Sequence, residues 1–241
     1  MNKSILYVLL AIAAVAILAF IFRSFNTSKT DDNNLTNNDN SQTELLITEI
    51  DGDKNDELVN GEYFTDVEAS MFNWEGRKTL IVGYKDQGTI NVQSGFMLVE
   101  EGALMSGEII LDMTSLTVDS VGQGGVAGLE RHLKSVDFFD VENFAEARVT
   151  LMSVVPVAEN NENGTKYNLE AEITIKDISN NVIIPAEVYM QDSNLVVFGQ
   201  VDLDRTLWDI RYGSDKFFDN LANNVIDDFF TVGFRFVSAQ K

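Results

Sequence analysis

The chain lacks cysteine altogether, and it contains a single histidine and only two prolines among 241 residues. Without cysteine it can form no disulfide, no thiolate metal site and no lipidated N-terminal cysteine, and the redox compartment stays open. Because His132 has no second imidazole to join it, a histidine cluster around a metal ion is excluded. We therefore predict neither a metal site nor a resident cofactor.

Positive charge is also scarce, since 17 lysines and arginines face 38 aspartates and glutamates, for a net charge of −21. Such a chain would be repelled by a phosphate backbone, so we expect no nucleic-acid partner. The plain interpretation of the acidity is solubility. The apolar share of 45% is ordinary for a protein with a buried core. The length allows one barrel-sized domain with appendages.

The sequence shows no catalytic constellation, and we predict no catalytic residues. A Ser-His-Asp arrangement would have to use His132, and no serine lies in a nucleophile-elbow pattern. The glycine-rich stretch 122–125 lacks the lysine of a phosphate-binding loop and indicates a turn before a helix. An enzyme whose site converges from distant strands stays an alternative, with Asp86 and His132 as its first candidates.

One long apolar run occupies residues 5–22, between Lys3 and Arg23. Its length reaches the lower end of the range that a membrane-spanning helix needs. A cleavable signal usually has a shorter apolar core and small residues at its exit, whereas this exit reads FIFRSFNTS. The pattern favours an uncleaved transmembrane anchor over residues 1–25, with a cleaved signal peptide, and hence a secreted protein, as the alternative.

Residues 26–60 are rich in Asn, Asp, Thr and Ser and cannot bury enough apolar surface to fold alone. We interpret them as a flexible acidic stalk. Three of them and one neighbour resemble a calcium-binding loop, but the position that needs glycine holds Asp56, and no helix pair flanks the stretch. The simpler interpretation is a polar stalk that matches by composition. The matching residues are Asp51, Asp53, Asn55 and Glu62.

From Gly61 onward the sequence changes to short strands separated by turns, which predicts a folded domain over residues 61–241. Apolar and polar residues alternate in 108–113 and most cleanly in 168–176, so each segment has one dry and one wet face. Segments 195–202 and 231–237 follow the same pattern. Turn signals lie at 101–102, 163–164 and 179–181. Helix is predicted only at 128–135 and at 214–223, with Ser214 as an N-cap. The pattern predicts an all-β sandwich or antiparallel barrel.

Phenylalanine is abundant, with 16 residues, and many lie late in the chain. Aromatic side chains of this kind can simply fill a core. The alternative is that part of the set lines a tunnel for a long apolar ligand. The late cluster comprises Phe217, Phe218, Phe229, Phe230, Phe234 and Phe236.

Two stretches carry a family resemblance, HLKSVDFFDV at 132–141 and DRTLWDIRYGS at 204–214. They resemble the signature stretches of the YceI-like family, and the similarity runs from Gly61 to Val237. Further matching positions are Ser70, Trp74, Gly76, the pair Asp112-Met113 and the pair Ser115-Leu116.

The resemblance implies a lipocalin-like barrel of about eight antiparallel strands, with one or two short helices, that holds a polyisoprenoid chain. It also implies an extracytoplasmic barrel, so the N-terminus would stay inside the cell and the anchor would cross the membrane once. The partner it implies is an isoprenoid lipid. The membrane is expected as a partner through the N-terminal apolar helix, and a homodimer stays open. The residues we expect to line the lipid tunnel are Phe96, Ile109, Leu111, Met113, His132, Phe138, Phe139, Leu151, Ile173, Arg205, Trp208, Tyr212, Phe217, Phe218 and Phe234.

The chain departs from the family pattern at two places. Asp86 replaces the histidine of a His-x-Gly motif, and Lys176-Asp177 stands where members often have Lys-Gly. An anionic prenyl phosphate would need cations at the tunnel mouth, and few are available, so we favour a quinone or another neutral isoprenoid. The candidate cations are Arg131, Lys134, Arg205 and Arg211.

Several of these residues also have structural interpretations. His132 can cap or pack a short helix. Trp208 and Tyr212 can close the barrel by packing. Arg205, between Asp204 and Asp209 in sequence, can form an internal ion pair. The alternative to lipid binding is a tethered structural or interaction barrel with a filled core and an acidic partner-binding surface.

Overall fold

The computed structural model describes residues 54–55, 57–122, 125–157 and 165–240. The predicted anchor and the stalk before Lys54 lie outside these residues. No helix in the described ranges is long and apolar enough to cross a membrane. The strands are β1 (Lys54–Asn55), β2 (Gly61–Thr65), β3 (Met71–Arg77), β4 (Lys85–Thr89), β5 (Asn91–Glu100), β6 (Ala103–Asp112), β7 (Glu146–Pro156), β8 (Thr165–Ile175), β9 (Ile178–Gln191), β10 (Asn194–Asp204) and β11 (Phe229–Gln240).

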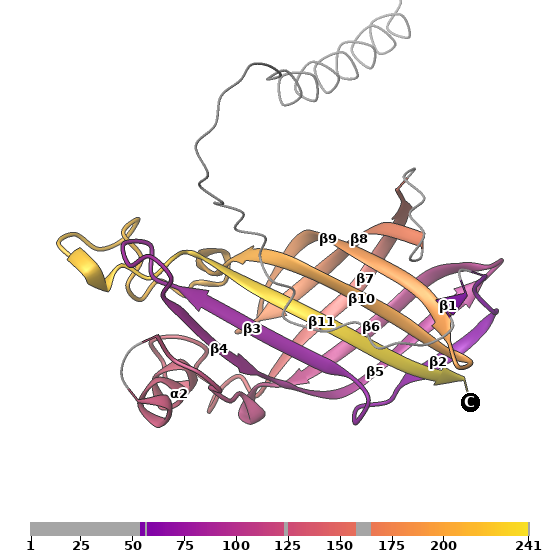
Figure 1. Ribbon diagram of the computed structural model, residues 1–241, viewed down its shortest axis with the longest axis horizontal. Helices are drawn as coiled ribbons and strands as arrows, with labels where there is room; N and C mark the ends of the chain where they lie inside the picture. The colour runs from indigo at the N-terminus through magenta and orange to yellow at the C-terminus, as the bar shows by residue number, and fades with distance from the viewer. Residues whose placement is uncertain (1–53, 56, 123–124, 158–164, 241) are drawn as a thin grey trace, which may run out of the picture. The chain divides into compact units, whose positions relative to one another are not determined.

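The strands pair antiparallel and close on themselves (Figure 1). Successive neighbours run β5–β6–β7–β8–β9–β10–β11, and β11 returns to β5 through β2. This ring is a closed antiparallel barrel of eight strands, as the sequence predicts. Closure pairs the backbone edges that an open sheet would expose.

Two positions of the ring are each occupied by two shorter strands in succession, β2 and β3 at one position and β4 and β5 at the next. β3 pairs with the first half of β11, and β2 pairs with its end. β4 and β5 are separated only by Ile90, whose amide donates to the carbonyl oxygen of Phe72 at 3.0 Å. The hydrogen-bonded ladder therefore continues along the barrel wall although the strands are interrupted.

The predicted alternation is confirmed in β8, where Leu169, Ala171, Ile173 and Ile175 are all buried. The turn after β8 lies elsewhere than predicted. Lys176 and Asp177 form it, both with positive φ, and residues 179–181 belong to β9. Asn-rich sequence is compatible with a turn, but the hydrogen-bond register of two long strands determines where the chain reverses.

The sheet also extends beyond the predicted domain start. Lys54 and Asn55, assigned to the stalk by composition, pair as β1 with Gln191 and Met190 at the end of β9. Leu58 is buried in the core. The last residues before Gly61 are therefore part of the folded unit.

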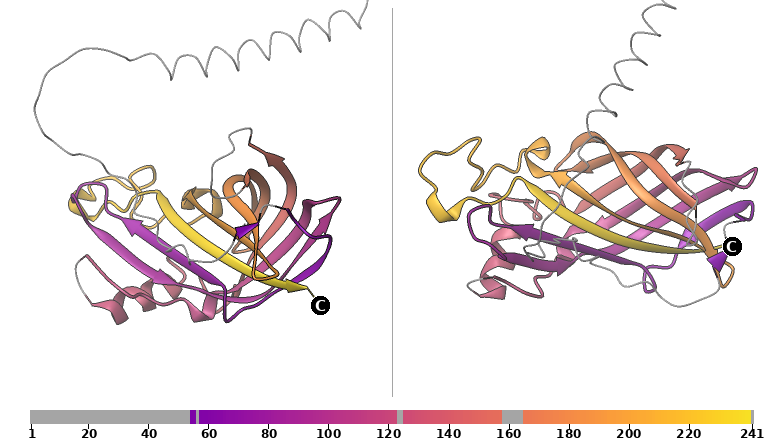
Figure 2. Two further views of the ribbon diagram at one scale, coloured as in Figure 1. Left: turned by 45° about the vertical axis from the view of Figure 1, so that its right-hand side comes forward. Right: turned by 45° about the horizontal axis from the view of Figure 1, so that its top comes forward.

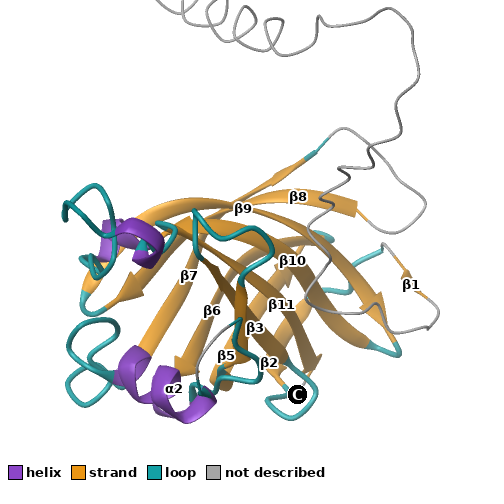
Figure 3. Ribbon diagram, turned by 60° about the vertical axis from the view of Figure 1, so that its left-hand side comes forward, coloured by secondary structure: helices purple, strands orange, loops and turns teal. Residues whose placement is uncertain are grey.

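One α-helix occurs in the described residues, α2 (Val126–Lys134), close to the segment predicted. It lies at one end of the barrel (Figure 3). The second predicted helix is wrong. Ser214 begins a single turn, in which its carbonyl accepts from the amides of Phe217 and Phe218, but Asn220 and Ala222 have positive φ and stop it. Three short 3-10 helices accompany α2 in the part of the chain that the structure describes: η1 (Met113–Ser115), η2 (Arg205–Trp208) and η3 (Ala222–Asn224).

Four connections lie at this same end, which we call the mouth. They are the β3–β4 loop, the segment that carries η1 and α2, the β8–β9 turn, and residues 205–228 between β10 and β11. Figures 1 and 2 agree in placing the β3–β4 loop beside residues 205–228. The opposite end carries the β5–β6 and β9–β10 turns.

Trp208 seals the barrel near the mouth. Its side chain is fully buried, and its indole Nε1 donates to the carbonyl oxygen of Ile173 at 3.0 Å. We expect Trp208→Ala to lower the free energy of unfolding by about 3–5 kcal/mol, because it removes a large buried ring and leaves a cavity. Trp208→Phe should cost less. Urea unfolding followed by circular dichroism measures both, and an alanine variant as stable as the parent would contradict this role.

Candidate functional site

A cavity of about 390 Å³ occupies the interior of the barrel. Along β6 it is lined by alternate residues, Gly107, Ile109 and Leu111, and it reaches from Leu104 to Met113 just beyond the strand. This distance corresponds to roughly 30 Å of strand. The cavity is therefore elongated and follows the barrel wall, and its volume lies in the range of small-molecule sites.

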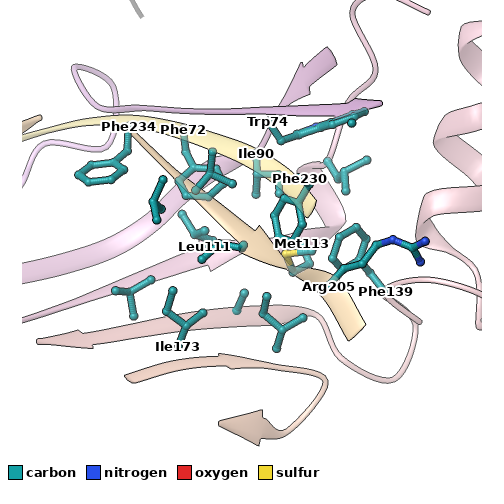
Figure 4. A pocket seen from close by; sticks show the side chains of 18 of the residues that line it. Phe72, Trp74, Ile90, Leu111, Met113, Phe139, Ile173, Arg205, Phe230 and Phe234 are labelled. Carbon is teal, nitrogen blue, oxygen red and sulfur yellow. The ribbon is translucent and has the colours of Figure 1, made fainter. Parts of the chain in front are cut away.

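The wall is almost entirely apolar in its interior. Figure 4 shows Phe72 and Phe234 toward one end and Arg205 with Phe139 toward the other. Aliphatic side chains such as Ile173 lie between them. The polar lining residues come mainly from the segments at the mouth: Arg77, Lys78, Tyr84, Asp86, His132, Arg205, Tyr212, Asn224 and Asp227. The site thus has a long dry interior and a polar entrance.

Most of the predicted tunnel residues line this cavity, some from inward positions of strands and the others from the segments at the mouth. Those that line the cavity are Ile109, Leu111, Met113, His132, Phe138, Phe139, Leu151, Ile173, Arg205, Tyr212 and Phe234.

Four predicted tunnel residues do not line the cavity. Phe96 is 42% exposed, because an irregularity between Val92 and Ser94 shifts the alternation so that Met97 and Val99 face inward instead. Trp208 is buried in the core outside the cavity lining. Phe217 and Phe218 are about half exposed on the segment between β10 and β11.

Sequence reasoning left out several aromatic lining residues. Phe72 and Trp74 alternate on β3, and Phe230 and Phe236 share the inward face of β11 with Phe234. The signal was present, since each pair or series follows the period of two. Recognising it required knowing that β3 and β11 are neighbours.

Arg205 organises the mouth. Its guanidinium is buried and donates to the carbonyl oxygens of Ile210 (2.8 Å) and Tyr212 (2.9 Å) on one side. On the other side it donates to the carbonyl oxygens of Asp227 (2.9 Å) and Ile226 (3.1 Å) and to the carboxylate of Asp228 (3.4 Å). Since a guanidinium has five N–H groups, none is left for a ligand.

The expected ion pair of Arg205 therefore forms with a distant residue and not with Asp209, which pairs with Arg211 at 2.6 Å. Burial lowers the pKa of Arg205, and the charge of Asp228 opposes that shift. Lys216 completes the cluster with its ammonium 3.1 Å from Asp204 and 2.9 Å from Asp228. This network ties both ends of the 205–228 segment to the barrel.

His132 lies at the entrance among aromatic rings. Its ring centroid is 4.6 Å from that of Tyr212 and 5.1 Å from that of Phe138, both edge-on. Its Nε2 is 3.2 Å from the carboxylate of Asp137. The contact joins α2 to the 205–228 segment. Both the structural and the ligand-contact interpretations of His132 are compatible with this position.

Asp86, which replaces the histidine of the family motif, also lines the entrance. Its carboxylate accepts from the amide of Gly122 at 3.0 Å. Within the described ranges, no three acidic or histidine side chains gather to hold a metal ion. Asp51 and Asp53 of the calcium-like stretch lie outside those ranges, and its two described members, Asn55 and Glu62, belong to different strands.

Comparison with known proteins identifies the barrel. The family model of the YceI-like domain matches residues 63–237. BcnA from Burkholderia cenocepacia shares 16% identity and a TM-score of 0.54 over 72% of this chain and 98% of its own. A polyisoprenoid binding domain from Saccharophagus degradans shares 13% identity and a TM-score of 0.51 over 76% of this chain and 100% of its own. No curated protein matches the sequence.

We predict that removing the charge of Arg205 strongly lowers the stability of the fold. Arg205→Met should lower the free energy of unfolding by about 3–5 kcal/mol, because it leaves four carbonyl oxygens without their donor and removes one of the two cations that contact the buried carboxylate of Asp228. Arg211→Met, at an exposed ion pair, is the matched control and should change stability little. Urea denaturation compares the two, and equal effects would argue against the central role of Arg205.

We predict that the contribution of the Asp204 carboxylate to the stability of the fold depends on pH. Burial raises the pKa of Asp204, but hydrogen bonds from Thr206 and Lys216 outweigh burial and hold the pKa below its ordinary value of 3.8. Its contribution to stability is therefore present above that value and is lost as the pH falls through the folded pKa. Asp204→Asn should melt earlier than the parent at pH 6, and the gap should close below about pH 4. A gap that stays constant in acid would contradict the assignment.

Proposed function

Because the chain belongs to the YceI-like domain family, we propose that its barrel binds an isoprenoid lipid, with the apolar chain in the tunnel and the polar head at the mouth. The observation that supports this most directly is the elongated, apolar cavity, open space within an otherwise packed barrel. Burial contributes roughly 0.8 kcal/mol per CH₂ group, so a long chain needs few polar contacts to bind tightly. The Saccharophagus relative with this fold is described as a polyisoprenoid binding domain.

A neutral head group suits the entrance better than a phosphate. Of the cations considered from the sequence, Lys134 pairs with Glu130 at 3.1 Å, and Arg205 and Arg211 have the partners described above. Arg77 and Lys85 both pair with the buried carboxylate of Glu75, at 2.6 and 3.2 Å. Arg131 does not line the cavity, and Lys78, which does, lies over the ring of Tyr84. Because most cations near the entrance are already engaged in such contacts, a prenyl phosphate would lose more hydration than the mouth can replace. A quinone or another neutral isoprenoid avoids that cost.

Sequestration or transport at the extracytoplasmic face of the membrane is the role that fits such a ligand. The apolar run at 5–22 would hold the barrel beside the lipid pool. The competing structural barrel requires a filled core, and the cavity disfavours it. An enzyme on the same site would have to use Asp86 and His132. Each already has a protein partner, Gly122 and Asp137 respectively.

The first test is organic extraction of the purified full chain, followed by mass spectrometry of the extract. We expect a neutral prenyl lipid in about equimolar amount. An empty extract, together with no binding of added quinones or prenyl phosphates in detergent, would contradict the proposal.

A tunnel-blocking variant sharpens this test. Ala171 lines the cavity from β8, and its neighbour Glu170 faces outward and is exposed. Ala171→Phe should reduce bound lipid at least tenfold by filling the tunnel, a loss that corresponds to about 1.4 kcal/mol or more. Glu170→Phe, the same change on the outer face, should retain the lipid. Thermal melting checks that both variants fold, and equal lipid content in folded variants would place the ligand elsewhere.

A further inference from the structure

Exposed apolar side chains project from the loops around the mouth. Val82 is fully exposed, Val136 is 72% exposed and Leu80 is 59% exposed. Phe217 and Phe218 are 44% and 49% exposed. These five residues, called the mouth rim below, come from the β3–β4 loop, the residues after α2, and the 205–228 segment. Such side chains lower solubility, so their grouping on loops needs a cause.

The three segments of the mouth rim are fixed to one another around the opening. The amide of Asp227 donates to the carbonyl oxygen of Arg77 at 2.9 Å, which ties the 205–228 segment to the end of β3. The contact between His132 and Tyr212 ties that segment to α2. Figures 1 and 2 show these segments at the same end of the barrel. The segments that carry the mouth rim are therefore joined to one another at the end of the barrel where the cavity has its entrance.

Other exposed apolar residues are more scattered, and Val59 and Val67 lie singly on connections away from the mouth. Phe96, Met105, Met152 and Ile183 belong to strands and lie on the outer wall of the barrel. Single apolar side chains on a strand face are normal for a soluble protein. The mouth rim differs because its members lie together on loops that extend past the strands. From there they can insert into a lipid phase while the barrel wall stays in water.

Cations accompany the aromatic residues of the mouth. The guanidinium of Arg211 lies 4.8 Å from the ring centroid of Phe217, and the ammonium of Lys78 lies 4.7 Å from that of Tyr84. Aromatic rings are enriched at the level of lipid headgroups, and long basic side chains reach past them toward phosphates and water. This pairing suits a bilayer surface better than the packed centre of a protein interface, which is depleted of lysine.

We propose that the mouth rim docks the barrel, entrance first, onto the surface of a zwitterionic lipid bilayer. The inference rests on the proposed function, because a tunnel ligand too apolar to cross water must enter where the opening meets its own phase. The net charge of −21 would be repelled by anionic lipid, so apolar insertion has to supply the attraction. Insertion of loop tips also explains why the apolar residues surround the entrance.

The predicted tether is long enough for this orientation. Lys54 pairs with the end of β9 that lies away from the mouth, so the chain leaves the barrel at the opposite end. β11, with 12 residues, is roughly 40 Å long. Residues 26–53 could span roughly 90 Å if fully extended. A chain of that length allows the mouth to face the membrane that holds the apolar run.

The absence of cysteine permits a direct test on the full chain. Asp219→Cys, next to Phe218, and Glu100→Cys, in the β5–β6 hairpin at the other end, each replace one exposed acid and can carry the same environment-sensitive fluorophore. With vesicles of phosphatidylcholine, we expect emission to shift to the blue at 219 only. Brominated acyl chains should quench the label at 219 at least threefold more than the label at 100. Equal quenching at both sites would overturn the proposal, as would no quenching at either.

A second variant links docking to lipid entry. Phe217→Ser with Phe218→Ser should abolish quenching at 219 and slow uptake of a quinone from vesicles roughly tenfold, since two half-exposed rings no longer insert. Its affinity for quinone delivered in detergent should change less than twofold, because neither ring lines the tunnel. Met105→Ser with Met152→Ser, on the outer wall, is the control and should behave as the parent. Unchanged vesicle uptake in the phenylalanine variant would overturn the proposal.

These measurements separate two kinds of failure. If the label at 219 inserts but no quinone or prenyl lipid binds in detergent, the proposed function is wrong and the docking surface is established by itself. If lipid binds in detergent but the label at 219 stays in water, the docking proposal is wrong and the lipid-binding proposal stands.

Discussion

The barrel depends on β11, which pairs along one edge with β10 and along the other with β3 and β2 in succession. These contacts join the last described strand to β2 and β3 near the start of the domain, so the sheet has no open edge in its ring. Closure forces one face of every strand inward. The consequence is an interior that must be filled by side chains or by a ligand, and here the side chains leave a cavity of about 390 Å³.

The chemistry of the site follows from where polar groups can be placed. Inside the ring, a polar side chain would lack partners, so the wall is built from aliphatic and aromatic residues such as Ile173 and Phe234. At the mouth, loops supply carbonyl oxygens, and Arg205 uses all of its donors to hold them. The same network that shapes the entrance leaves little free charge there, which bears directly on the kind of head group the site would accept.

The alternation of apolar and polar residues predicted the strands of the barrel wall better than it predicted the irregular segments and loops. The inward residues of β6 and β8 could be recognised from their alternation alone, because the period of two holds in any strand. The prediction failed for Phe96, where an irregularity in the pairing of β5 with β6 reverses the alternation. It failed again for residues 214–223, because positive φ at Asn220 and Ala222 ends the turn that Ser214 begins. The irregularity in β5 has no local sequence signature, and asparagine at position 220 only permits the left-handed conformation without requiring it.

The sequence by itself determined the fold class, the family and the apolar character of the interior, since these follow from alternation and from the two stretches at 132–141 and 204–214. Only the tertiary structure decided that Asp228 and not Asp209 is the partner of Arg205, that Trp208 packs outside the tunnel, and that Phe217 and Phe218 are exposed at its entrance. The physical reason is that these outcomes depend on which distant segments lie side by side at the mouth. Closure of the barrel determines this, and more than a hundred residues separate the first and last strands of the barrel.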